Sequence, residues 1–269
     1  MCVKRNDDGQ AKMDYALHSK IALIVGGTTG IGFATAKGFA SAGATVVLAA
    51  RNGEKGAAAI RELDMLGAKA TFFECDVSDT ASISNLFGSV LGKFGTLDCA
   101  VNSAAYDFKL AKAHEVPGQE IAEHLAVDVQ GLFHCMRAEI VAMLGGKGGT
   151  IVNIASTTGL SGTPTAALYS AGKHAVIGLT RSTAKEYIGN GIRINAVCPG
   201  VTNTPRRARR MAHLSNAQRT EQDQALALEI PIGRPAAAEE IANAVIWLSS
   251  PVSSYVVGHS LVIDGGLTA

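Results

Sequence analysis

A glycine-rich turn between an apolar segment and a helical one is the feature that most constrains how this chain folds. Residues 20–25 read Lys-Ile-Ala-Leu-Ile-Val, which is typical of a buried strand, and residues 33–40 have the composition of a helix. Between them runs Gly26-Gly27-Thr28-Thr29-Gly30-Ile31-Gly32. A glycine cluster alone is compatible with a simple tight turn. Strand, turn and helix in this order let backbone amides and a helix N-terminus hold a pyrophosphate, so the context favours nucleotide binding.

Six further apolar runs follow, separated by longer amphipathic stretches. They cover residues 44–48, 71–73, 97–101, 151–154, 192–197 and 261–263. This alternation predicts an α/β fold: a single doubly wound, Rossmann-type parallel β-sheet with helices on both faces and a ligand crevice at the carboxyl ends of its strands. We expect one domain over residues 19–269, preceded by a polar N-terminal leader over residues 1–18.

Three side chains in the second half of the chain are suited to carbonyl–alcohol redox chemistry. Tyr169 and Lys173 are four residues apart and share a face if the stretch is helical, and Ser156 lies thirteen residues before Tyr169. A phenol can exchange a proton with a carbonyl or hydroxyl oxygen, and a nearby ammonium favours its phenolate form. An isolated pair of this kind is more often a packed ring and a solvated charge, so the neighbouring motifs decide.

Together with the glycine turn, these residues resemble the short-chain dehydrogenase/reductase family, and the resemblance covers nearly the whole chain. Further matching segments occur in the family's order: Cys75-Asp76-Val77, residues 101–105, Arg193-Ile194-Asn195, Pro199-Gly200-Val201-x-x-Thr204, residues 230–234 and residues 262–266. The resemblance implies that Tyr169 is the general acid and base, that Lys173 holds the nicotinamide ribose, and that Ser156 positions the substrate oxygen. It implies these cofactor contacts: Gly26, Thr28, Thr29, Gly30, Ile31, Arg51, Asn52, Asp76, Val77, Asn102, Ala104, Tyr169, Lys173, Pro199, Gly200, Val201 and Thr204.

The residues after the second apolar run bear on which nicotinamide cofactor is used. An acid there would bind both ribose hydroxyls of NAD, but this chain reads Ala50-Arg51-Asn52. A guanidinium can bind the 2′-phosphate of NADP, so we favour NADP(H). NAD(H) remains the alternative, with Arg51 stacked on adenine or lying in solvent.

Two segments depart from the regular pattern. The polar stretch over residues 202–228 contains Arg206-Arg207-Ala208-Arg209-Arg210, and in the resembled family this place is the substrate lid. The arginines either meet an anionic substrate or form a solvated helix face, and the second interpretation is the commoner one. Asp128 stands where the family has Asn, which orients a water that links the catalytic lysine to solvent, so we expect Asp128 to act in that proton relay or to pair with Lys173.

Composition excludes several other classes of function. The formal net charge is +1 and charged residues make up 17%, which gives no reason to expect a nucleic-acid partner. No apolar run is long enough for a membrane span, and we expect a cytoplasmic protein. The five cysteines and seven histidines lack metal-ligand spacing, so we expect no metal, and packing or surface roles are favoured for His124 and His134.

We therefore predict an NADP(H)-dependent oxidoreductase that interconverts a ketone or aldehyde with an alcohol. The alternatives are an NAD-dependent alcohol dehydrogenase of the same family and a non-catalytic dinucleotide-binding protein. By resemblance we expect a homo-oligomer, a dimer or a homotetramer, that pairs through helices over residues 118–144 and 168–187. Apolar residues suited to that interface are Leu132, Phe133, Ala175, Val176 and Leu179.

Overall fold

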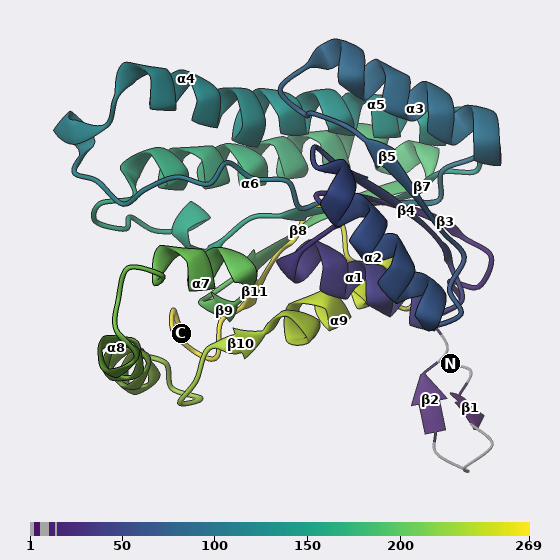
Figure 1. The fold of residues 1–269 in the computed structure, drawn as a ribbon. Helices are drawn as coiled ribbons and strands as arrows, with labels where there is room; N and C mark the ends of the chain where they lie inside the picture. Colours follow the sequence, from purple (N-terminus) through teal and green to yellow (C-terminus); the bar gives the residue numbers. More distant parts are fainter. Residues whose placement is uncertain (1–2, 6–10, 14) are drawn as a thin grey trace.

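The seven predicted strands form one parallel sheet. The computed structural model describes residues 3–5, 11–13 and 15–269. The strand order is β11-β8-β7-β6-β3-β4-β5, which confirms the predicted doubly wound fold (Figure 1). The strands are β3 (Ile21–Val25), β4 (Thr45–Ala50), β5 (Ala70–Glu74), β6 (Cys99–Asn102), β7 (Gly149–Ile154), β8 (Ile192–Pro199) and β11 (Ser260–Ile263).

Helices cover both faces of this sheet (Figure 1). On one face lie α1 (Gly30–Ser41), α2 (Gly53–Met65) and α9 (Ala238–Ser249), and on the other α3 (Thr80–Phe94), α5 (Leu132–Leu144) and α6 (Ala167–Tyr187). Because successive side chains of a strand point to opposite faces, Leu23 packs into the core under α3 and α5 while Ile24 packs into the core under α1 and α9. Both are completely buried, as expected of a parallel strand covered on both sides.

The predicted helix over residues 118–144 is present as three consecutive helical segments. They are α4 (Gly118–Leu125), a π-helical segment η2 (Ala126–Gly131) and α5. Asp128 lies in the π-helical segment, and π-helical turns occur frequently at functional sites. Single 3-10 turns are η1 (Ala113–Glu115), η3 (Thr157–Gly159), η4 (Ile188–Asn190) and η5 (Pro251–Ser253).

The polar segment after β8 folds into two capped helices beside the carboxyl ends of the strands. A short strand β9 (Thr202–Asn203) pairs in parallel with β10 (Ala236–Ala237), and between them lie α7 (Pro205–Arg210) and α8 (Asn216–Glu229). Thr204 caps α7 by accepting a hydrogen bond from the Arg207 amide, and Pro205 occupies the first helical position. Ser215 and Gln218 form a capping box that starts α8.

The predicted leader, residues 1–18, lies partly outside the described residues. Within it, β1 (Val3–Arg5) pairs antiparallel with β2 (Ala11–Met13), and these strands lie apart from the main sheet (Figure 1). Leu17 is 2% exposed and packs into the core beside α1 and α9, so the last residues of the leader contact the main fold. No helix among the described residues combines the length and the apolarity that crossing a membrane requires.

Candidate active site

A cavity of about 970 Å³ opens at the carboxyl ends of the central strands. Its lining joins the glycine turn, the ends of β4 and β7, the residues after β6 and β8, and helices α6, α7 and α8. Of the residues predicted to bind cofactor or substrate, the cavity brings together Gly26, Thr28, Thr29, Gly30, Ile31, Arg51, Val77, Ala104, Ser156, Tyr169, Lys173, Pro199, Gly200, Val201 and Thr204. The fold therefore collects at one place residues that are spread over most of the chain.

The glycine turn is shaped to accept a pyrophosphate. Gly26 has φ of +80°, and a Cβ there would lie 2.5 Å from the backbone nitrogen of Ala104, so only glycine fits. Thr29 precedes α1 with extended backbone and no capping side chain, and the first turn of α1 carries no acidic residue. The N-terminal amides of α1 are thus left for a ligand, and the helix dipole favours an anion there. This half of the cavity is therefore suited to an anionic ligand such as a pyrophosphate.

Ser156, Tyr169 and Lys173 meet in the other half of the cavity. Ser156 follows β7, and its hydroxyl accepts a 3.2 Å hydrogen bond from the Thr158 amide, which fixes its side chain. Tyr169 and Lys173 lie one turn apart on α6, and the Lys173 ammonium is 5.6 Å from the centre of the Tyr169 ring. Lys173 is 4% exposed and donates a 3.1 Å hydrogen bond to the Ile154 carbonyl. The lysine is thus a buried, oriented cation beside the phenol.

An aromatic cluster surrounds the phenol ring. The ring of Phe108 stacks on Tyr169 with centroids 4.4 Å apart, and the His124 ring stands edge-on to Tyr169 at 6.2 Å. His124 is completely buried and lies at the end of α4, whereas His134 is half-buried and does not line the cavity. The geometry therefore supports a packing role for His124. One of the rings that it packs against is Tyr169, the candidate catalytic residue.

Asp128 lies beneath the cavity and does not line it. Its Oδ1 accepts a 2.7 Å hydrogen bond from the Tyr106 amide, and its Oδ2 is 3.1 Å from Nε2 of His124, although this pair lacks hydrogen-bond alignment. Burial acts to raise the pKa of Asp128, but the charge of Lys173 and the contacts with His124 and Tyr106 outweigh it and lower the pKa. Asp128 is therefore an ionised carboxylate that fastens the loop after β6.

Three predicted cofactor residues also lie outside the lining of the cavity. Asn52 caps α2 by accepting a 2.8 Å hydrogen bond from the Lys55 amide, and Asp76 accepts two hydrogen bonds from Ser78. Asn102 is buried in β6 and donates to Glu139 and Asn153, both at 3.0 Å. Burial raises the pKa of Glu139 to about 8. These contacts brace the ends of the strands that carry the cavity.

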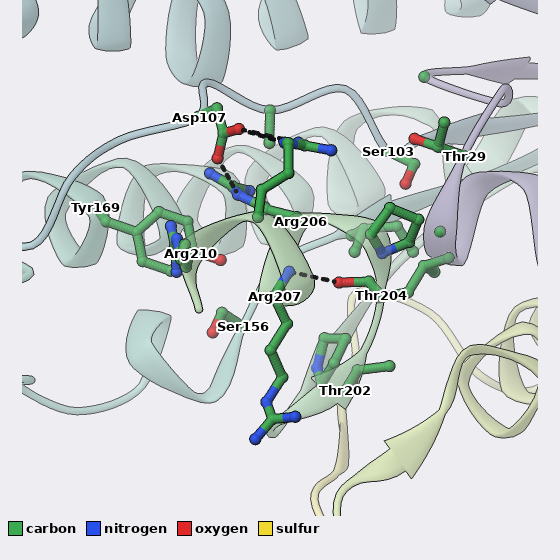
Figure 2. A pocket seen from close by; sticks show the side chains of 18 of the residues that line it. Thr29, Ser103, Asp107, Ser156, Tyr169, Thr202, Thr204, Arg206, Arg207 and Arg210 are labelled. Carbon is green, nitrogen blue, oxygen red and sulfur yellow. Dashed lines mark hydrogen bonds and ion pairs between the residues drawn. The ribbon is translucent and has the colours of Figure 1, made fainter. Parts of the chain in front are cut away.

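The sequence predicted a substrate lid over residues 202–228, but it did not identify the residue that joins this segment to the rest of the cavity. Asp107 forms ion pairs with Arg206 at 3.2 Å and with Arg209 at 2.9 Å. These ion pairs join the loop after β6 to α7 (Figure 2). Arg206 also donates to the Tyr106 carbonyl, and Phe108 lies between this helix and Tyr169. The arginine run was visible in the sequence, but nothing in the sequence indicated its partner about one hundred residues away.

Known proteins are similar to this chain over almost its full length. Residues 25–268 match the family model described as enoyl-(acyl carrier protein) reductase. The A-factor type gamma-butyrolactone 1'-reductase of Streptomyces virginiae is 40% identical over 253 residues, 94% of this chain and 96% of that protein. The 2,5-dichloro-2,5-cyclohexadiene-1,4-diol dehydrogenase of Sphingobium indicum is 37% identical over 254 residues, 94% of this chain and 98% of that protein.

A solved structure is also similar to this chain over almost its full length. The crystal structure of a variant actinorhodin polyketide ketoreductase with NADPH has a TM-score of 0.88 and 33% sequence identity, and the match covers 93% of this chain and 97% of that one. The full-length matches, the parallel sheet and the cavity agree with one another. The chain belongs to the short-chain dehydrogenase/reductase family, the NAD(P)-dependent oxidoreductases that act on CH–OH and C=O groups.

Proposed function

We propose that the protein is an NADP(H)-dependent oxidoreductase that interconverts a ketone or aldehyde with an alcohol, with Tyr169 as general acid and base. The observation that carries this proposal is the meeting of Ser156, Tyr169 and Lys173 in the same cavity as the glycine turn. When bound, the nicotinamide cofactor supplies or accepts the hydride. The protein then has to hold the substrate oxygen and move one proton.

The three side chains divide this work. In reduction, the Tyr169 hydroxyl gives its proton to the substrate oxygen, and in oxidation the phenolate takes it back. The Ser156 hydroxyl donates a hydrogen bond to the same oxygen and orients it. The buried Lys173 ammonium stabilises the phenolate, and its hydrogen bond to the Ile154 carbonyl fixes its position.

Arg51 supports the preference for NADP(H). It is exposed at the end of β4 and lines the cavity, and it forms no ion pair among the described residues. Its guanidinium is thus available for a 2′-phosphate. The NADPH-bound ketoreductase that this chain resembles adds support. We expect Arg51→Ala to weaken NADPH binding about 10-fold or more while changing NADH binding little, as titration of each cofactor measures. Equal affinity of the unchanged protein for the two cofactors would favour the NAD alternative.

The proposed chemistry is tested by Tyr169→Phe. The variant loses only the hydroxyl, so we expect turnover to fall by about 10²–10⁴-fold while NADPH affinity stays within about twofold. Turnover is followed by nicotinamide absorbance over a panel of ketones, aldehydes and alcohols. Full activity in the Phe variant would rule out the mechanism. Cofactor binding by the unchanged protein with no turnover over the whole panel would favour the non-catalytic alternative.

A homotetramer or dimer that pairs through α5 and α6 is a further part of the proposal. Support comes from a groove between these helices whose lining is mostly apolar: Phe133, Ile140, Val141, Leu144 and Tyr187, together with Arg137, Thr183 and Glu186. Val141 is 64% exposed and Phe133 is 44% exposed. Val176, in contrast, is buried in the chain's own core, so it is unsuited to an interface. Sedimentation of the protein and of Val141→Glu tests this pairing, because a charge in the apolar interface favours the smaller species.

A further inference from the structure

Helix α7 presents four arginines, of which three are already engaged. Arg206 binds Asp107 and the Tyr106 carbonyl, and Arg209 binds Asp107. Arg207 binds Asn203 and Asp223, and its side chain extends away from Tyr169 (Figure 2). These contacts fix the position of the helix. They leave the fourth arginine to be explained.

Arg210 differs from the other three because it has no carboxylate partner. Among the described residues its only hydrogen bond is a 3.4 Å contact from Nη2 to the Phe108 carbonyl, and no acidic oxygen lies within ion-pair distance. A guanidinium has five N–H donors, so most of its hydrogen-bonding capacity is free. The Arg210 residue is exposed overall. Partial desolvation of its guanidinium and the charges of Arg206 and Arg209 lower the pKa of Arg210, against the opposing effect of Tyr169 and Asp107.

The free guanidinium lies next to the reacting groups. It sits 4.2 Å from the centre of the Phe108 ring, and this ring stacks on Tyr169 at 4.4 Å. Arg210, Tyr169 and Ser156 line the same cavity, and Figure 2 shows all three around its substrate side. Arg210 and Tyr169 therefore contact the same aromatic ring, Phe108.

The cavity lining near these polar groups includes apolar side chains. Leu110, Met211, Leu214 and Leu226 line the cavity together with the polar His213, Gln222 and Glu229, and the buried Phe108 contacts both Tyr169 and Arg210. The apolar side chains accept a hydrocarbon body, while a polar group is bound at each end. The phosphates of a cofactor are accommodated elsewhere, at the glycine turn and beside Arg51.

We propose that the substrate is an oxo or hydroxy acid whose carboxylate binds Arg210 while its carbonyl or hydroxyl oxygen binds Tyr169 and Ser156. This inference rests on the proposed function, because it names the substrate class of the same site. A carboxylate matches the fork of a guanidinium and supplies the ion-pair partner that Arg210 lacks among the described residues. Arg210 is then a specificity-determining residue.

The test compares a keto acid with its uncharged methyl ester. 4-Oxocyclohexanecarboxylate and its methyl ester are reduced with NADPH by the unchanged enzyme, Arg210→Met, Arg210→Lys and Arg207→Met. We expect kcat/KM of the unchanged enzyme to favour the acid about 30-fold, Arg210→Met to abolish this preference through KM, and Arg210→Lys to restore part of it. Arg207→Met removes the same charge from the same helix and should leave the ratio intact. An acid-to-ester ratio that is near one, or that Arg210→Met does not change, would overturn the inference.

A binding measurement separates this inference from the proposed function. Calorimetry of the unreactive probes cyclohexanecarboxylate and cyclohexanecarboxamide, with NADPH present, should show that the carboxylate binds at least about 10-fold more tightly and that Arg210→Met removes the difference. Selective binding without turnover of any ketone would leave the inference standing and contradict the proposed function. Turnover of ketones with no selective binding of the carboxylate would support the proposed function and contradict the inference. If Arg210→Met instead weakens NADPH binding, Arg210 serves the cofactor and the inference is wrong.

Discussion

The half of the cavity assigned to the nucleotide and the half assigned to the substrate are formed by different parts of the residues. The nucleotide half is made of backbone: a glycine turn with positive φ at Gly26 and Gly30, the N-terminus of α1, and strand ends. The substrate half is made of side chains, and the Asp107–Arg206 pair that closes it joins residues 99 positions apart. The first half depends on conformations that a short segment of sequence sets locally. The second depends on contacts that only the complete fold brings about.

The largest predicted effect comes from adding a single carbon atom to the glycine turn. Gly26→Ala places a Cβ 2.5 Å from the Ala104 nitrogen and forces φ of +80° on a residue that disfavours it. We expect NADPH affinity to fall at least about 100-fold and the free energy of unfolding to fall by about 2–3 kcal/mol. Fluorescence titration and thermal unfolding measure the two effects.

Gly67→Ala is the matched control for this prediction. Gly67 has φ of +72°, but nothing lies within 4 Å of the Cβ that alanine would add. The backbone strain is therefore similar and the clash is absent, so we expect a loss of about 1 kcal/mol in stability and unchanged cofactor affinity. If the two variants behaved alike, the close approach of the turn to Ala104 would have no role in binding.

A second prediction concerns the buried polar network under the nucleotide half. The pKa of Glu139 is raised from 4.5 to about 8, so the folded protein keeps a proton that the unfolded chain releases. Stability therefore falls as the pH rises from about 4.5 to about 8. Glu139→Gln mimics the protonated form, keeps an acceptor for Asn102, and should flatten this dependence. We expect it to raise the free energy of unfolding by on the order of 2 kcal/mol at pH 8 and to change it little at pH 5. Parallel unfolding curves at both pH values would contradict the burial of an uncharged Glu139.

The backbone half is the part that the sequence could predict. Alternating apolar runs identified every strand of the parallel sheet, and the glycine turn that was predicted to bind the cofactor lines the cavity. Tyr169 and Lys173 were also predictable, because four-residue spacing on a helix fixes a shared face. Each of these patterns involves residues that are close in the sequence, so it can be recognised without knowing the fold.

The sequence said less about residues whose roles depend on distant partners. Asn52 and Asp76 were predicted to contact the cofactor, which stays a prediction, and the sequence did not indicate that Oδ1 of Asn52 caps α2 or that Oδ1 of Asp76 accepts two hydrogen bonds from Ser78. Asp128 was predicted to act in the proton relay or to pair with Lys173, which stays a prediction, and nothing in the sequence indicated the hydrogen bond that it accepts from the Tyr106 amide. Nothing in the sequence around Arg210 indicates that it alone on α7 lacks an acidic partner, because that depends on where Asp107 and Asp223 fold.

The side-chain half should respond to its own ion pairs without affecting the nucleotide half. Asp107→Asn removes the partner of Arg206 and Arg209, but Asp107 is 48% exposed, so solvent already weakens these pairs. We expect KM for ketone substrates to rise about fivefold and NADPH affinity to stay within about twofold. Asp223→Asn, which removes the partner of Arg207, should change neither value. An equal loss of cofactor affinity in Asp107→Asn would show that the two halves are energetically one unit.

The smallest predicted effect lies where the two halves meet. The lowered pKa of Asp128 keeps its carboxylate ionised throughout the pH range of an assay, so its own titration does not produce the pH dependence of turnover. Its charge instead acts on the groups that face it, Lys173, His124 and the nearby Tyr169, and a negative charge there disfavours the phenolate. Asp128→Asn keeps an acceptor for the Tyr106 amide and removes the charge. The rising limb of the pH–rate profile for alcohol oxidation should therefore move to lower pH by on the order of half a unit, with the maximum rate within about twofold. Asp223→Asn removes an equal charge far from these groups and should leave the limb in place. An unmoved limb in Asp128→Asn would mean that Asp128 only fastens the loop and has no electrostatic influence on the phenol.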